Sequence, residues 1–156
     1  MKKEISVKRV RYDAEEVFRI GGFYCSEAIV SSVRKNIDPN MPIALVSAGS
    51  GFPIGVGRAK CMCGAISGAV ICLGYFFGKD RSAPASAKGK TCAELAYELQ
   101  ESFRKNHKGT LCCHIHVKGM DLASGEHKKQ CVSFTGEMAA KVAEIIAREL
   151  DLKVVG

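Results

Sequence analysis

Cysteine is the residue type in this sequence that is best suited to chemistry. The chain of 156 residues has eight cysteines. Such thiols can ligate a metal, carry out redox chemistry, or fill a core as small apolar groups. The eight are Cys25, Cys61, Cys63, Cys72, Cys92, Cys112, Cys113 and Cys131.

The expected cellular compartment bears on whether these cysteines form disulfides. The first residues, MKKEISVKRVRYD, have positive charges but no apolar stretch behind them, so we expect no secretory signal. The longest apolar run, residues 68–77, is about half of the roughly 20 residues that a membrane span needs. We therefore expect a cytoplasmic protein that does not associate with membranes, in which structural disulfides are disfavoured.

The spacing of the cysteines does not match a common motif. Cys61 and Cys63 form a CxC pair, and Cys112 and Cys113 are adjacent. Neither is the CxxC of zinc ribbons or thioredoxin-like proteins, and neither CxxCH nor a ferredoxin pattern is present. By spacing alone, buried structural thiols remain a valid interpretation.

Local context separates the cysteines into two groups. Cys25 and Cys63 lie near the starts of predicted helices, where the positive end of the helix dipole stabilises a thiolate. Cys113 follows a break at Gly109, and Cys131 leads towards the last helix. The other group is structural: Cys72 lies among apolar residues in mid-helix, and Cys92 lies in the first turn of an amphipathic helix.

Four histidines add nitrogen donors to the same part of the chain. His107, His114, His116 and His127 all lie between residues 107 and 131. His114 and His116 follow Cys112 and Cys113 directly, so they are candidate additional ligands, as are Cys61 and Cys112. The alternative is that these histidines are surface residues of a loop. No Ser/His/Asp arrangement is visible, and GSGFPIGVG lacks the Lys-Ser/Thr of a phosphate-binding loop.

Four blocks of the sequence together carry a family resemblance. They are GGFYCSEAI, CGAISGAVICLG, LCCHIHVKG and KKQC, in this order, from about Phe18 to Ile146. In these blocks the sequence resembles the redox-active family that is named for its C…GCAxxG…C…C signature. The second block reads Cys-Gly-Ala where the signature reads Gly-Cys-Ala, so the exact register of this block stays open.

The resemblance implies a small, mostly helical cytoplasmic protein with a redox function. It implies that the functional cysteines are Cys25, Cys63, Cys113 (or its neighbour Cys112) and Cys131. Four converging thiolates would hold zinc or an iron–sulfur cluster for electron transfer, which is the interpretation that we favour. Two of them would suffice for dithiol–disulfide exchange, and this alternative stays open.

Helical periodicity dominates the sequence and predicts one all-α domain over residues 1–156. The segment 63–77 is apolar on nearly all sides, as expected of a central buried helix. Thr91 and Glu94 form a capping-box signature, whereas residues 36–60 are rich in Pro and Gly and 79–90 form a polar linker. The predicted helices cover residues 13–20 with Asp13 as the N-cap, 23–33, 42–47, 63–77, 91–106 and 136–150.

The distribution of charge along the sequence bears on whether the partner is a nucleic acid. The 23 basic and 16 acidic residues leave a net charge of +7, but the basic residues are spread along the chain. No RNA-binding or zinc-finger pattern is present, which argues against a nucleic-acid partner. A zinc-stabilised structural or nucleic-acid-binding module is kept as a third class of function. We expect a redox partner protein, and a second copy of the chain stays open as a partner.

Overall fold

The computed structural model describes residues 1–79 and 88–156, so most of the predicted linker at 79–90 lies outside the described residues. The regular structure of the described part is helical apart from two short strands, which confirms the predicted all-α class. The elements are β1 (Glu4–Ile5), α1 (Val7–Arg19), α2 (Cys25–Asn36), α3 (Ala44–Ala48), α4 (Gly64–Phe77), α5 (Cys92–Asn106), α6 (Cys113–His116), α7 (Lys128–Glu149) and β2 (Lys153–Val154).

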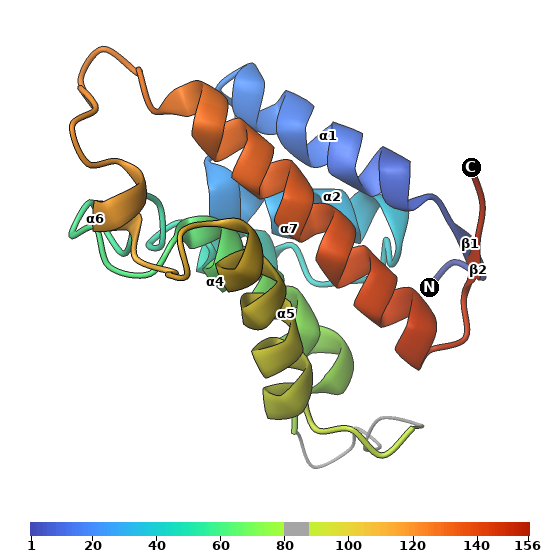
Figure 1. Cartoon of the computed structure of the whole chain (residues 1–156). Helices are drawn as coiled ribbons and strands as arrows, with labels where there is room; N and C mark the ends of the chain where they lie inside the picture. The colour runs from blue at the N-terminus through green and yellow to red at the C-terminus, as the bar shows by residue number, and fades with distance from the viewer. Residues whose placement is uncertain (80–87) are drawn as a thin grey trace.

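The longest helix, α7, organises the described part of the molecule. It runs beside α1 and also packs against α2, α4 and α5 (Figure 1). The apolar helix α4 is buried against α2, α5 and α7. Helix α4, which the sequence predicted to be central, therefore lies among three other helices, and α7 is the one that also covers α1.

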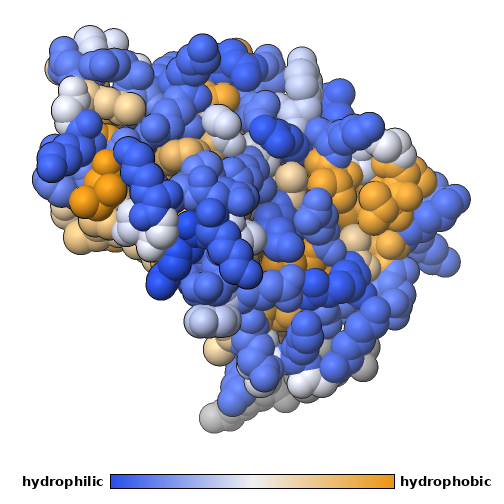
Figure 2. Space-filling model, viewed as in Figure 1, coloured by the Kyte–Doolittle hydropathy of each residue, from blue (hydrophilic) through white to orange (hydrophobic). Residues whose placement is uncertain are grey.

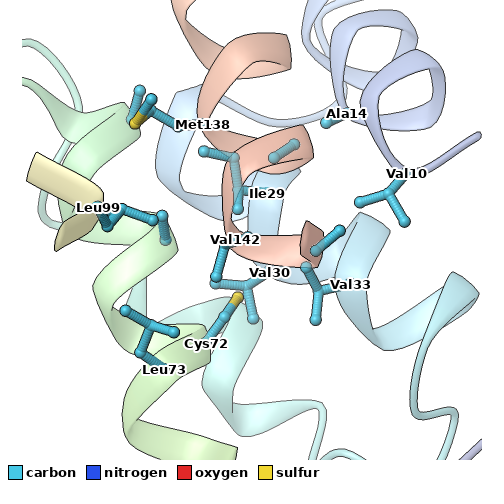
Figure 3. Packing of buried hydrophobic residues seen from close by; sticks show 14 of the residues in the cluster. Val10, Ala14, Ile29, Val30, Val33, Cys72, Leu73, Leu99, Met138 and Val142 are labelled. Atoms are coloured by element: carbon cyan, nitrogen blue, oxygen red, sulfur yellow. The ribbon is translucent and has the colours of Figure 1, made fainter. Parts of the chain in front are cut away.

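Side chains from four helices meet in the core, as Figure 3 shows. Val10 of α1, Ile29 of α2, Cys72 of α4 and Val142 of α7 are all fully buried there. Burial of an aliphatic side chain of this kind contributes about 1.5–3 kcal/mol. Cys72 lies among these apolar groups and is a core residue, as its neighbours in the sequence predict.

The two ends of the chain are joined by a parallel strand pair. Glu4 pairs with Lys153 and Ile5 with Val154, so β1 and β2 lie together at the right of Figure 1, near both termini. Strands of two residues are too short to produce a periodic pattern, so they cannot be recognised from the sequence.

Helix α1 begins six residues before the predicted start. Ser6 caps it, because the Ser6 hydroxyl accepts a hydrogen bond from the backbone N–H of Arg9 at 3.2 Å. Asp13 is therefore not an N-cap. It is buried in mid-helix, where Arg9 and Lys35 form ion pairs with its carboxylate at 3.1 and 3.0 Å.

Helix α7 also begins earlier than predicted, at Lys128 instead of Gly136. The polar start Lys-Lys-Gln has no apolar stripe, and glycine is a poor helix former, so the pattern appeared to start late. Glycine at position 136 leaves room for the side chain of Glu15 on α1, which a Cβ there would displace. The extension places Cys131 in the first turn of α7.

The surface in view is mainly hydrophilic. Figure 2 shows polar side chains over most of this face, with apolar groups gathered towards the side of the two strands. In residues 1–79 and 88–156, none of the helices has the length and apolar character that crossing a bilayer demands.

Candidate functional site

Four cysteines that lie far apart in the sequence line one small cavity. The cavity has a volume of about 30 Å³ and walls that are almost entirely apolar. The structure brings together the four positions to which the sequence assigned function. The cavity is lined by Phe18, Tyr24, Cys25, Pro53, Ile54, Cys63, Gly64, Cys113, Val117, His127 and Cys131.

Each of the four cysteines lies at the beginning of a helix. Cys25 is the first residue of α2, Cys63 immediately precedes α4, Cys113 begins the short α6, and Cys131 lies in the first turn of α7. Helix α6 and the starts of α4 and α7 lie towards the left of Figure 1, away from the chain termini. The first N–H groups of a helix carry positive partial charge, so the longer helices α2, α4 and α7 direct favourable dipoles at a thiolate.

Hydrogen bonds hold the start of α2 in place. The Glu27 carboxylate accepts from the backbone N–H of Tyr24 at 2.9 Å and from the Ser50 hydroxyl at 2.6 Å. The Ser26 hydroxyl, which is fully buried, donates to the carbonyl of Gly49 at 2.6 Å. These contacts attach both sides of Cys25 to the segment that follows α3.

Glycines allow α4 to approach Cys25 closely. A Cβ at position 64 would lie 2.5 Å from the Cys25 sulfur, and a Cβ at position 68 would lie 2.7 Å from the Cα of Ser26. The spacing Gly64-x-x-x-Gly68 puts both glycines on the face of α4 that meets α2. This contact explains the small residues of the second sequence block in physical terms.

A short antiparallel bridge positions Cys63 relative to Cys113. Met62 and Cys112 are bridge partners. The N–H of Cys63 donates to the carbonyl of Leu111 at 2.8 Å, and the N–H of Cys113 donates to the carbonyl of Cys61 at 2.6 Å. The two segments that provide the second and third cysteines are therefore bonded to each other through their backbones.

A group of aromatic rings holds α6 against the helices. His116, which is 4% exposed, lies edge-on to Phe103 at 5.4 Å and Phe134 at 5.3 Å between ring centroids. Its Nε2 hydrogen-bonds with the carbonyl of Thr110 at 2.9 Å, and its own carbonyl accepts from the Gln130 side chain. His116 therefore fixes the loop that carries Cys113.

The structure does not bring the additional candidate ligands to the cavity. Neither His114 nor His116 lines it, and His114 is exposed. Cys61 is exposed and Cys112 is half-buried, and neither lines it. Both lie close enough to Cys113 for their charges to raise its pKa, but they remain outside the space that Cys63 and Cys113 share.

His127 lines the cavity and was missed as a candidate. It precedes α7 and lies four residues before Cys131, with the N–H of Cys131 donating to the His127 carbonyl at 3.0 Å. Residues four apart share a helix face. That spacing would have identified His127 if α7 had been predicted from its true start.

Burial keeps the four thiols protonated in this arrangement. It is the main reason that the pKa of Cys63 rises to about 11 and that of Cys131 to about 12. The pKa of Cys25 and that of Cys113 are also raised, mainly by burial. The N–H groups of Ala65 and Ile66 lower the pKa of Cys63 in part.

The donors suit a soft metal in type and number, but the arrangement is wider than a coordination sphere. Thiolates favour zinc, copper(I) and iron in iron–sulfur clusters. In the described part of the chain, no three His, Cys, Asp or Glu side chains form a group that could hold a metal ion. A cavity of about 30 Å³ is larger than the roughly 10–15 Å³ that one water molecule requires, so it has room for one small ion or molecule.

Comparison with known proteins agrees with the pattern of cysteines. The family described as "Putative redox-active protein (C_GCAxxG_C_C)" matches residues 23–145, a range that contains all four cavity cysteines. Comparisons with curated proteins and with solved structures give no match. Because the family match covers most of the chain, we conclude that this protein belongs to the C_GCAxxG_C_C redox-active family.

Proposed function

We propose that Cys25, Cys63, Cys113 and Cys131 form a redox centre that binds iron through their thiolates and transfers electrons to a partner protein. The observation that carries this proposal is that four thiols from four helix starts line one apolar cavity. Two thiols would be enough for exchange, whereas four thiols match the number of ligands in a metal–thiolate site.

Burial supports metal binding over exchange with an external disulfide. Cys25 and Cys63 are each 8% exposed and Cys113 is 6% exposed. Exchange begins with direct attack of a thiolate on the sulfur of the partner, which requires access. A metal-bound centre needs no such contact, because electrons can pass through the protein to a partner on the surface.

The chain itself would supply the thiolates and the electrostatic support. The N–H groups of Ser26 and Ile54 face the Cys25 sulfur, and those of Ala65 and Ile66 face the Cys63 sulfur. Hydrogen bonds of this kind and burial tune the reduction potential of an iron–thiolate site. Iron would supply one-electron oxidation and reduction at this position. The proposed location is the reducing cytoplasm, where such thiols persist.

Anaerobic iron reconstitution tests the proposal. Reduced protein is incubated with ferrous iron, with and without sulfide, and bound iron, zinc and acid-labile sulfide are measured after desalting. We expect stoichiometric iron and a visible thiolate-to-iron absorption band. The matched variants are Cys63→Ser, which should lose the iron, and Cys72→Ala, which should retain it.

Each of the other outcomes distinguishes between alternative forms of the centre or contradicts its location. Labile sulfide in proportion to iron identifies a cluster, and iron without sulfide identifies a single ion. Zinc at one equivalent with no iron uptake replaces the redox proposal with a zinc-stabilised module. Equal iron in the wild type and in Cys63→Ser overturns the assignment of the cavity.

A metal-free dithiol centre is the second candidate, and the central position of Cys63 favours it. The electrostatic influence of Cys63 reaches both Cys25 and Cys131, and Cys63 in turn responds to Cys113. Two thiols would join as one disulfide while an oxidised low-molecular-weight disulfide accepts two electrons and two protons and becomes two thiols. Mass spectrometry distinguishes this candidate: the oxidised protein would be two hydrogens lighter and would contain no metal.

A further inference from the structure

A larger hollow adjoins the cysteine cavity and shares a wall with it. Its volume is about 220 Å³, which is below the 300–1,000 Å³ typical of sites for drug-sized ligands. Phe18, Tyr24, Ile54 and His127 line both spaces. A molecule in the hollow would therefore be separated from the thiols only by these side chains.

Positive charge gathers at the rim of this hollow. Arg58 and Lys128 both line it, and no acidic residue does so in the described part of the chain. Burial lowers the pKa of His127 first of all, and the charges of Arg58 and Lys128 lower it further, so both cations lie close to its ring. Within residues 1–79 and 88–156, neither cation forms an ion pair at 4.0 Å or less.

His127 adds a polar atom without a partner. Its Nδ1 is buried, and among the described residues no group is in hydrogen-bond contact with it. A buried polar atom of this kind normally has a protein or water partner. An oxygen atom of a ligand placed between the two cations would provide one once the His127 ring turns this atom towards the hollow.

The rest of the hollow is apolar, and part of it is held in a strained backbone. The backbones of Ile54 and Arg58 have φ angles of 51° and 68°, in the left-handed region that residues other than glycine rarely adopt. Such strain persists only where surrounding contacts impose it, and it costs of order 1–3 kcal/mol for each residue. The apolar lining outside the shared wall consists of Phe23 and Leu122.

We infer that this hollow binds a small organic anion, with its carboxylate between Arg58, Lys128 and His127 and its apolar body against the wall shared with the thiols. The two cations favour a negatively charged group. The aromatic and aliphatic lining favours an apolar part of the ligand, which an inorganic oxyanion lacks. The inference rests on the proposed function only for the role of the ligand at the thiols, because binding itself requires no metal.

Calorimetric titration of reduced, metal-free protein tests this site. The probes are benzoate, the neutral benzyl alcohol, and inorganic phosphate. We expect saturable benzoate binding, at least about tenfold tighter than that of either other probe, which corresponds to about 1.4 kcal/mol. Arg58→Ala and Lys128→Ala should each weaken benzoate binding about fivefold or more, whereas Lys129→Ala should not. The Lys129→Ala variant removes one positive charge at the neighbouring position, and Lys129 lines a different hollow.

Several results would overturn the inference. They are benzyl alcohol binding as tightly as benzoate, phosphate binding as tightly as benzoate, an equal effect of Lys129→Ala, and no saturable benzoate binding below about 10 mM. Arg58 and Lys128 are exposed, so their variants should fold, and circular dichroism checks this. Iron uptake is measured on the same preparations. A protein that binds benzoate but not iron contradicts the proposed function alone, and the reverse contradicts only this inference.

Discussion

Cys63 is both the N-cap residue of α4 and a candidate redox thiol. Its side chain makes no capping hydrogen bond, but the N–H groups of Ala65 and Ile66 are near enough to its sulfur to lower its pKa. Serine is among the best N-cap residues, because its hydroxyl accepts hydrogen bonds from such groups. Stability and chemistry can therefore be separated at this residue.

We predict that Cys63→Ser changes the free energy of unfolding by less than about 1 kcal/mol while it abolishes iron binding. A serine hydroxyl suits the N-cap position of α4, but it does not replace a thiolate ligand. Chemical denaturation and iron analysis of the same sample measure both effects. Loss of the fold together with the iron would show that the thiol at this position is mainly structural.

Cys72 should show the opposite behaviour, because it is fully buried in the apolar core. Cys72→Ala should lower the free energy of unfolding by about 1 kcal/mol through a small cavity. Cys72→Ser should cost more, by about a further 1–3 kcal/mol, since its hydroxyl enters an apolar site. Both variants should bind iron like the wild type, and a loss of iron in Cys72→Ala would place the centre elsewhere.

At the scale of elements, the approach of α4 to α2 determines where Cys25 lies. Gly68→Ala should destabilise the protein by about 1–3 kcal/mol, because the new Cβ would meet the Ser26 backbone at 2.7 Å. Gly74→Ala is the matched control in the same helix. Nothing lies within 4 Å of its Cβ position, so it should stabilise by about 0.5–1 kcal/mol. Thermal unfolding of both variants checks the sign, and equal effects would contradict the close crossing.

The contact between α1 and α2 should depend on pH through Asp13. Burial by itself would raise the pKa of Asp13, but hydrogen bonds from Asn36 and Lys35 and the charges of Lys35 and Arg9 outweigh it and lower the pKa. A carboxyl group with a lowered folded pKa adds stability above its unfolded pKa of about 3.9, and this stability is lost as the pH falls through the folded pKa.

Asp13→Asn should therefore lower the free energy of unfolding by about 2 kcal/mol at pH 7. The difference from the wild type should shrink below about pH 4, where the unfolded chain begins to bind a proton at Asp13 that the folded protein binds only at lower pH. Urea denaturation at a series of pH values provides the measurement. A difference that stays constant down to pH 3 would show that the carboxylate charge does not stabilise this contact.

At the scale of the whole molecule, the strand pair joins the chain ends and covers Ile5, which is 2% exposed. Deletion of residues 153–156 removes the strand pairing and the adjoining backbone hydrogen bonds from Lys153 to Lys3 and from Val155 to Ile5. We expect a loss of about 1–3 kcal/mol and a fall in Tm of about 2–4 °C for each kcal/mol.

The control for this deletion is Lys153→Ala, which keeps the backbone pairing. It removes only the ion pair with Glu4, in which the two side chains are 69% and 55% exposed. Such exposed pairs contribute little, so we expect no resolvable change in Tm. A deletion that unfolds no earlier than Lys153→Ala would show that the strand pair is not stabilising.

Features that depend on neighbouring residues could be read from the sequence. The apolar stripe of the helix at 91–106, its Thr91–Glu94 capping box and the buried position of Cys72 all follow from local periodicity and chemistry, and the structure agrees with each. The order of the four cysteine blocks pointed to the family, and the family match confirms it. None of this required knowledge of which helices touch.

Tertiary structure decided how these residues meet. Cys25, Cys63, Cys113 and Cys131 line one cavity because glycines let α4 approach α2 and a backbone bridge joins residues 61–63 to 111–113. The hollow that brings Arg58 to Lys128 depends in the same way on a loop meeting a helix start 70 residues later in the chain. Periodicity reports which side of an element is buried, but it contains no information on which partner covers that side. The cysteines could therefore be selected from the sequence, whereas the cavity they line and the cationic hollow beside it arise only from packing between distant segments.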